Sequence, residues 1–163
     1  MATGHIAPTG LPWCFDDGGR AAANFRGEAG DCVVRAIAIA TGTGYRSVYD
    51  DLAARAKAHQ ARSRSRRALT RTGKPRSTSP RDGVATAVFK AYLTQVQGWV
   101  WTPTMAIGSG TTVHLAVGEL PDGPVIARVS RHLCAVIDGV VRDTYDPTRD
   151  GTRCVYGYYT PGA

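Results

Sequence analysis

The sequence predicts an α+β domain in which an N-terminal helical half packs on a C-terminal antiparallel sheet. Two observations support this prediction. Apolar residues recur at helical spacing between residues 31 and 96, whereas from Trp99 onward short apolar runs alternate with Gly, Pro-Asp-Gly and Asp-Gly turn signals. The 163 residues have the length of about one domain and show no internal repeat, so we expect a single domain over residues 1–163.

The first helix is expected to begin at Cys32. Residues 1–30 are rich in Gly, Pro and Asp and should be mostly irregular. Apolar side chains then share one helical face: Val34, Ile37 and Ala38. Asp31 is a good N-cap and Gly42 is a good stop, so Cys32 is predicted to be the first residue of a short buried helix.

Two further helices are expected before the strands begin, one from Tyr45 to about Ala58 and one from Val84 to Val96. Their inward positions are Val48, Leu52 and Ala53 in the first, and Val84, Val88, Tyr92 and Val96 in the second. Residues 60–81 between them are rich in Arg and Ser, contain two prolines and have little apolar content. We expect this segment to be a flexible basic insertion.

The insertion concentrates the positive charge of the chain. The formal net charge is +7, but residues 55–81 carry ten Lys/Arg and no Asp/Glu, so the remainder has ten basic against thirteen acidic residues. Such a segment contacts nucleic-acid phosphates without sequence preference, recognises an acidic partner protein, or is simply solvated. The arginines that would contact phosphate are Arg62, Arg64, Arg66, Arg67 and Arg71.

A β-hairpin is expected around Asp138-Gly139, because Asp-Gly between two apolar runs is a strong hairpin signal. With these two residues as the turn, residues whose numbers sum to 277 face one another. His132 then lies opposite Tyr145, and Asp143 is its diagonal neighbour on the same face. Asp146 points to the other face, because side chains alternate along a strand. The hairpin thus places a carboxylate beside an imidazole.

Cys32 has the sequence context of a reactive thiol. A thiol at a helix N-terminus or beside an imidazolium has a lowered pKa and attacks as a thiolate. Gly30 lets a substrate approach closely, and the Cys32 amide, at an unsatisfied helix start, can help to stabilise an oxyanion. His132 and Asp143 supply a base and the carboxylate that orients it. His114 is the rival base, and no carboxylate follows it at hairpin distance.

These residues resemble those of a known enzyme family. Gly30-Asp31-Cys32 opening a helix, followed far along the chain by a histidine on one strand and a carboxylate on the next, resembles papain-like cysteine peptidases. Pro124–Val129 and His132–Val136 are similar to the paired strands of a compact branch that includes bacteriocin-leader peptidases and related phage-borne proteins. The resemblance implies a papain-like fold and cleavage of a peptide or amide bond with no metal or organic cofactor.

Two aspartates compete for the third position of the triad that the resemblance implies. In papain the asparagine of the triad is followed two residues later by a tryptophan that covers the histidine, and Asp143-Thr144-Tyr145 fits that arrangement with Tyr145 as the cover. Leader peptidases often use an Asp-Pro pair, which would select Asp146-Pro147. The strand geometry favours Asp143.

The oxyanion hole departs from the family pattern. The family has a glutamine about six residues before the cysteine, where this chain has Arg26. Asn24 is the nearest amide side chain. Either Asn24 takes the role, or the Cys32 amide works with a donor from elsewhere.

Composition excludes several other classes. No apolar stretch approaches the ~20 residues that cross a bilayer, and the start lacks a secretory signal, so a cytoplasmic protein is expected. The four cysteines, Cys14, Cys32, Cys134 and Cys154, form no Cys-x-x-Cys pair and no zinc-ligand pattern. We therefore predict a cysteine hydrolase acting on a peptide or protein. The alternative is a non-catalytic papain-like scaffold that binds nucleic acid or an acidic partner through residues 55–81.

Overall fold

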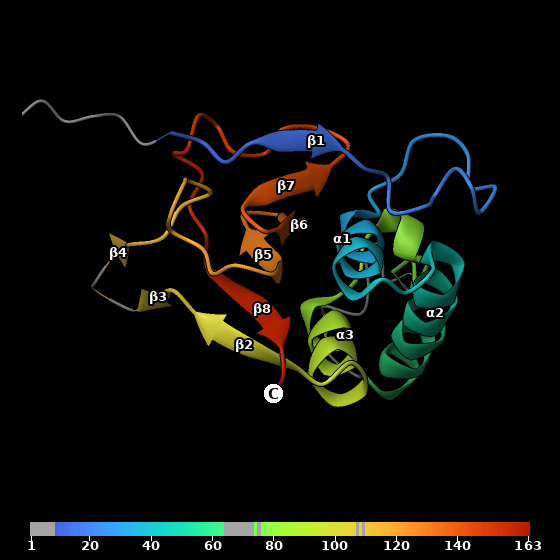
Figure 1. Ribbon diagram of the computed structural model, residues 1–163. Helices are drawn as coiled ribbons and strands as arrows, with labels where there is room; N and C mark the ends of the chain where they lie inside the picture. Colours follow the sequence, from blue (N-terminus) through green and yellow to red (C-terminus); the bar gives the residue numbers. More distant parts are fainter. Residues whose placement is uncertain (1–8, 64–73, 75, 107, 109) are drawn as a thin grey trace, which may run out of the picture.

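A computed structural model of the chain describes residues 9–63, 74, 76–106, 108 and 110–163. The helices are α1 (Cys32–Thr41), α2 (Tyr45–Arg62) and α3 (Thr86–Ala91), with a 3₁₀-helix at Pro80–Asp82 and a π-helix at Tyr92–Val96. The strands are β1 (Trp13–Phe15), β2 (Trp99–Pro103), β3 (Met105–Ala106), β4 (Gly110–Thr111), β5 (Pro124–Val129), β6 (His132–Ile137), β7 (Val140–Asp143) and β8 (Gly157–Pro161). The three α-helices gather beside the sheet (Figure 1), so the fold class is α+β, as the sequence predicts.

Six strands form one mixed sheet in the order β1-β7-β6-β5-β8-β2, while β3 and β4 pair separately. Its neighbours run antiparallel except β1 and β7, which are parallel. The prediction of an antiparallel sheet is therefore wrong at this edge, where residues 1–30 were expected to be mostly irregular. A strand of three residues is too short to show the alternation by which strands are recognised in a sequence.

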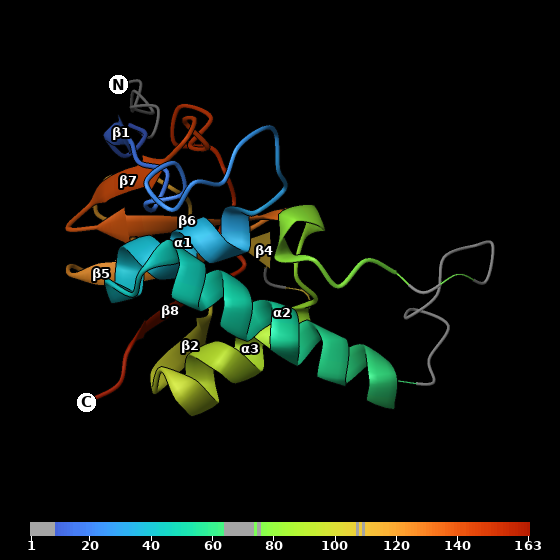
Figure 2. The same ribbon diagram turned by 90° about the vertical axis from the view of Figure 1, so that its right-hand side faces the viewer.

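Strand β6 is covered on both faces. Leu133 and Ala135 pack against the helices in one apolar core, and Cys134 and Val136 belong to a second core on the opposite face. Figure 2 shows α1, α2 and α3 in front of the strands, on the same side of the sheet. Since β6 begins at His132, the two cores fix the backbone that carries this histidine.

Helix α1 begins at Cys32 and ends before Gly42, as predicted, and Gly42 has the left-handed conformation (φ 70°) typical of a helix end. The predicted cap at its start is wrong in one respect. Asp31 occupies the N-cap position, but its side chain makes no hydrogen bond to the helix backbone. Charged and hydroxyl partners from other segments engage this carboxylate instead.

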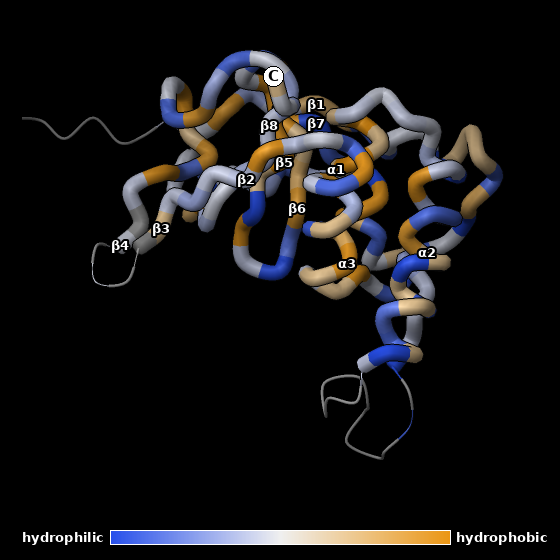
Figure 3. Tube along the Cα trace, turned by 90° about the horizontal axis from the view of Figure 1, so that it is seen from below, coloured by the Kyte–Doolittle hydropathy of each residue, from blue (hydrophilic) through white to orange (hydrophobic). Residues whose placement is uncertain are grey.

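Helix α2 runs to Arg62, past its predicted end. Its buried side chains, Tyr45, Val48 and Leu52, fall in its first half, and in the rest alanines alternate with charged and polar residues (Figure 3). Residues 60–62 are therefore helical and residues 80–81 belong to the 3₁₀-helix, so both ends of the predicted insertion are regular structure. Residues 64–73 and 75, its centre, lie outside the described residues. In the part of the chain that the structure describes, no helix is long and apolar enough to cross a bilayer.

The helix predicted over residues 84–96 is divided in two. After α3 the chain forms a π-turn, in which the backbone N–H of Gln97 donates to the carbonyl of Tyr92, five residues earlier (3.1 Å). Val88 and Tyr92 are buried as predicted, but Val96 is exposed. The wider turn rotates Val96 away from the apolar stripe.

The β6–β7 hairpin has the predicted register. Ala135 pairs with Arg142 and Ile137 with Val140. The turn residues in Asp138-Gly139 have φ values of 48° and 75°, the left-handed pair that a type I′ turn requires. This register brings the start of β6 next to the end of β7.

Candidate active site

Cys32 lies where helix α1 meets the start of strand β6. As the first residue of α1, it is at the positive end of the helix dipole. Two residues at the start of β6 act on its thiol: the imidazole of His132 and the backbone N–H of Leu133 both lower its pKa. The thiol is half-buried and lines a pocket of about 360 Å³ together with His132. Segments far apart in sequence therefore bring a thiol and an imidazole to one pocket.

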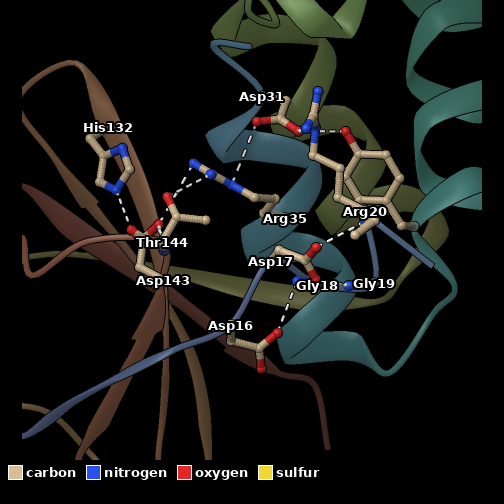
Figure 4. A network of polar contacts seen from close by, with 12 residues as sticks. Asp16, Asp17, Gly18, Gly19, Arg20, Asp31, Arg35, His132, Asp143 and Thr144 are labelled. Carbon is tan, nitrogen blue, oxygen red and sulfur yellow. Dashed lines mark hydrogen bonds and ion pairs between the residues drawn. The ribbon is translucent and has the colours of Figure 1, made fainter. Parts of the chain in front are cut away.

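The imidazole of His132 also contacts Asp143. Its Nε2 lies 2.5 Å from Oδ2 of Asp143 (Figure 4). Because Nε2 is engaged, Nδ1 is the nitrogen available to the Cys32 thiol. His132 is 8% exposed and Asp143 is 3% exposed, so bulk water competes little for this hydrogen bond. His132 is thus hydrogen-bonded to Asp143 and interacts electrostatically with both Asp143 and Cys32.

The environment favours charge on both Cys32 and His132. Burial raises the pKa of the Cys32 thiol, but the hydrogen bond and charge of His132, the Leu133 N–H and the charge of Arg35 together bring it below its usual value. Burial lowers the pKa of His132, but its hydrogen bonds to Asp143 and Cys32 raise it to about 9. Both shifts favour the charged forms, a thiolate beside an imidazolium, and the thiolate is the nucleophilic form of cysteine.

Asp143 is held by contacts from three directions. Its Oδ1 accepts the backbone N–H of Thr144 (2.7 Å) and lies 3.6 Å from a guanidinium nitrogen of Arg35. Its backbone carbonyl accepts the N–H of Asp16 (3.0 Å) and the indole N–H of Trp13 (3.3 Å). The parallel strand β1, which the sequence did not predict, thus fixes the end of β7 where this carboxylate stands.

The rival aspartate takes no part in the chain of contacts. Asp146 is exposed, and its Oδ1 accepts the backbone N–H of Thr148 (2.9 Å). The ring of Tyr145 lies 5.1 Å from that of His132, centroid to centroid, in the position expected for a cover. Both observations agree with the preference for Asp143 as the partner of His132.

Arg35 joins the start of α1 to Asp143 (Figure 4). Its Nε lies 3.6 Å from Oδ1 of Asp31, and its Nη1 donates to the hydroxyl of Thr144 (2.8 Å). With its contact to Asp143, the guanidinium stands between two buried carboxylates. The sequence analysis assigned Arg35 no role. A signal was present, because Asp31 and Arg35 are four residues apart and a charge interrupts an apolar run.

Asp31 is the most deeply buried charge in this network, at 1% exposure. It accepts a short hydrogen bond from the hydroxyl of Tyr45 and pairs with Nε of Arg20 (3.0 Å). A single acid at a helix start therefore ties α1 to α2 and to the N-terminal loop. These partners explain why the carboxylate does not cap its own helix.

The oxyanion-hole candidates differ in position. Asn24 is exposed, has φ 64° in a turn, and does not line the pocket that contains Cys32. The prediction that places its amide in the hole is therefore unsupported by the geometry. The backbone N–H of Cys32 has no acceptor among the described residues. It is the donor that remains for a developing oxyanion.

His114, the rival base, contacts a carboxylate that the hairpin reasoning missed. Its Nδ1 lies 3.2 Å from Glu119 Oε2. Neither residue lines the pocket of Cys32. The sequence analysis preferred His132 because it found no carboxylate partner for His114. Glu119 is such a partner, but His132 is the histidine that lines the pocket with Cys32.

The basic segment is described only at its ends. Arg62 is exposed at the end of α2, where its Nε donates to the carbonyl of Ala58 (3.3 Å). The other four arginines named for phosphate contact, Arg64, Arg66, Arg67 and Arg71, lie outside the described residues. Arg81, at the far end, donates to the carbonyls of Arg26 and Glu28 (2.9 and 3.0 Å) and accepts the Gly30 N–H on its own carbonyl (2.7 Å). This arginine supports the loop that leads to Cys32.

Comparison with known proteins adds no family assignment: no protein-family model, no curated protein and no solved structure matches this chain. Within the described ranges, no group of three or more His, Cys, Asp or Glu side chains is arranged to hold a metal ion. The chemistry of the site is therefore argued from its own residues.

Proposed function

We propose that this protein is a cysteine hydrolase of papain-like type that cleaves a peptide or amide bond. In this proposal Cys32 is the nucleophile, His132 is the base and acid, and Asp143 orients His132. The observation that carries it is that Cys32, the first residue of a helix, lines one pocket with His132, whose imidazole is hydrogen-bonded to the buried Asp143 carboxylate.

The proposed reaction has two stages. The Cys32 thiolate adds to the substrate carbonyl, and the resulting oxyanion is stabilised by the Cys32 N–H. The C–N bond breaks as the imidazolium of His132 gives its proton to the leaving amine, and a thioester to Cys32 remains. Water then adds to the thioester while His132 takes a proton. Cleavage of the C–S bond releases the carboxylic acid and restores the thiolate–imidazolium pair.

The resemblance to papain-like peptidases supports the same assignment. Cysteine at a helix start, histidine on a strand, carboxylate on the next strand and an aromatic cover occur in the order that the family uses. The coarser statement, an α+β fold, holds independently of this resemblance.

Alkylation mapping tests the nucleophile. Iodoacetamide is applied to the folded protein at pH 7, and the rate at each cysteine is followed by mass spectrometry. We expect Cys32 to react at least about ten times faster than Cys14 and Cys154, the half-exposed thiols that serve as internal controls. A rate at Cys32 equal to theirs would remove the basis of the proposal.

A second function is proposed for the basic segment, because ten Lys/Arg without an acid in residues 55–81 favour contact with phosphates or with an acidic protein. Affinity for a mixed-sequence oligonucleotide is measured against salt concentration, with the whole chain and with residues 64–75 replaced by a Gly/Ser linker. Binding that weakens with salt and disappears with the replacement supports nucleic-acid contact. Binding that survives the replacement contradicts it.

A further inference from the structure

The pocket that holds the Cys32 thiol carries two guanidinium groups. Arg128, near the end of β5, and Arg131, in the turn between β5 and β6, line it together with Cys32 and His132. Strand pairing on both sides fixes the backbone of Arg128, and its carbonyl accepts the N–H of Tyr156 (2.8 Å). The sheet therefore sets the position of at least one positive charge beside the nucleophile.

Neither charge is neutralised within the part of the chain that the structure describes. No carboxylate there forms an ion pair with Arg128 or Arg131. The polar side-chain contact of Arg128 is a long one, 3.5 Å from Nη2 to the hydroxyl of Thr86. Of the described residues that line the pocket, Asp82 is the only carboxylate, and it accepts a hydrogen bond from the hydroxyl of Ser77 (2.6 Å). The pocket keeps an excess of positive charge.

The adjoining pocket, of about 810 Å³, has the opposite character, although Gly30 and Asp82 line both. Its arginines are engaged by protein acceptors: Arg20, Arg35 and Arg81. Its carboxylates Asp17 and Glu28 have no ion pair among the described residues. Unpaired positive charge is thus a local property of the pocket that contains the thiol.

We propose that this pocket selects substrates with an acidic side chain next to the bond that is cleaved, and that Arg128, assisted by Arg131, binds the side-chain carboxylate. A planar guanidinium matches a carboxylate with two parallel hydrogen bonds, and a half-buried position strengthens the attraction. This inference rests on the proposed function, because it assigns the substrate of the same nucleophile.

Two alkylating agents test the charge of the pocket without a peptide substrate. Iodoacetate is an anion and iodoacetamide is neutral, and with both the Cys32 thiolate displaces iodide to form an S–C bond. The measured quantity is the ratio of the iodoacetate rate to the iodoacetamide rate at Cys32 at pH 7. We expect Arg128→Gln to lower this ratio about threefold and Arg128→Glu about tenfold, because a charge beside the reacting anion is removed or reversed.

Two control variants test whether a change in this ratio is specific to the charge at Arg128. Arg128→Lys keeps the charge and should keep most of the ratio, and Glu28→Gln, in the adjoining pocket, should leave it unchanged. The iodoacetamide rate at Cys32 shows in the same samples that the nucleophile still works. An unchanged ratio in both Arg128→Gln and Arg128→Glu overturns the inference. A slow iodoacetamide reaction in the unaltered protein would instead count against the proposed function.

Peptides then test the substrate class. A library with acetylated N-termini and amidated C-termini carries Asp, Asn or Lys in turn at each position, so that only side chains bear charge. We expect cleavage next to the Asp-containing positions, with Arg128→Glu shifting the preference toward Lys. A parallel experiment uses N-acetylated peptides that have uncharged side chains and a free C-terminal carboxylate. Faster cleavage in that experiment alone would show that a chain end, and not a side chain, is the anion, and would contradict the proposal.

Discussion

Cys32 and Cys134 are two thiols of one protein in opposite electrostatic situations. Cys32 stands at the start of α1, beside an imidazole and a backbone N–H, and its pKa is lowered. Cys134 lies in β6, two residues after His132, fully buried on the opposite side of the strand from Leu133, and burial raises its pKa far above the usual value. Both are followed by apolar residues in the sequence, and the difference lies in what the fold places next to each sulfur.

Because burial raises the pKa of both thiols, hydrogen bonds and nearby charges decide which of the two has a lowered pKa. Desolvation raises the pKa at each site. At Cys32 the hydrogen bond and charge of His132, with the Leu133 N–H and the charge of Arg35, reverse the outcome. At Cys134 the largest charge effect is that of the Asp143 carboxylate, which raises the pKa further, against a smaller lowering by Arg153. Substitutions near Cys32 can remove the contributors to this difference one at a time. Cys134 should stay unreactive in every variant that remains folded.

The largest effect is expected for His132→Ala. Without the imidazolium, the pKa of Cys32 returns toward or above its usual value, and we expect its iodoacetamide rate at pH 6.5 to fall about 100-fold. Peptide hydrolysis, where found, should disappear. Rates are measured by mass spectrometry, with the rate at Cys154 as a control. A Cys32 rate within about threefold of the unaltered protein would show that the helix start alone activates the thiol.

Asp143→Asn should lower the rate at which iodoacetamide alkylates Cys32 by about tenfold, because it weakens the thiolate–imidazolium pair of Cys32 and His132. The carboxylate is one of the two groups, with Cys32, that raise the pKa of His132 to about 9, so its removal lets the imidazole lose its proton at a lower pH. The upper limit of the pH range in which thiolate and imidazolium coexist should therefore move down. A pH series of NMR spectra of His132 measures the shift. Asp146→Asn is the matched control, and an equal shift there would contradict the assignment of Asp143.

Arg35→Met should lower the Cys32 rate about threefold and lower the free energy of unfolding by about 2–3 kcal/mol, because two buried carboxylates lose a shared cation. Urea denaturation measures the stability. Arg142→Met is the control, since Arg142 pairs with Asp16 at the surface over 3.7 Å and should change stability by less than about 0.5 kcal/mol. Equal losses in the two variants would show that the Arg35 contacts contribute no more than a surface pair.

The smallest effect is expected for Tyr145→Ala, about twofold in the Cys32 rate. Loss of the ring exposes the His132–Asp143 hydrogen bond to water, which weakens it. Tyr145→Phe keeps the cover and should behave as the unaltered protein. If both variants lose activity equally, the hydroxyl and not the ring face is what matters.

Much of the site could be predicted because its geometry is local. The Asp138-Gly139 turn fixes the hairpin register, and that register puts Asp143 beside His132 without any knowledge of the remaining fold. The helix start at Cys32 follows from apolar periodicity and the stop at Gly42. These are short-range patterns, and the fold did not override them.

The misses depend on contacts between distant segments. Asp31 has good N-cap chemistry, yet Arg20 and Tyr45 compete successfully for its carboxylate. The partner of strand β1 is β7, which lies more than 120 residues further along the chain. Propensity at one position holds no information about such partners. Arg35 illustrates the same limit, because its second carboxylate comes from the far end of the chain.

Strand β1 makes the position of the Asp143 carboxylate depend on an intact N-terminal segment. Trp13, in the short edge strand β1, and Asp16, directly after it, donate to the backbone carbonyl of Asp143, and a loop through Gly18 and Gly19 follows them. Cleavage of this loop by a protease would weaken the contacts that hold the backbone of Asp143 and would leave Cys32 and His132 chemically unchanged. In the proposed function, activity should therefore require β1 to be paired with β7.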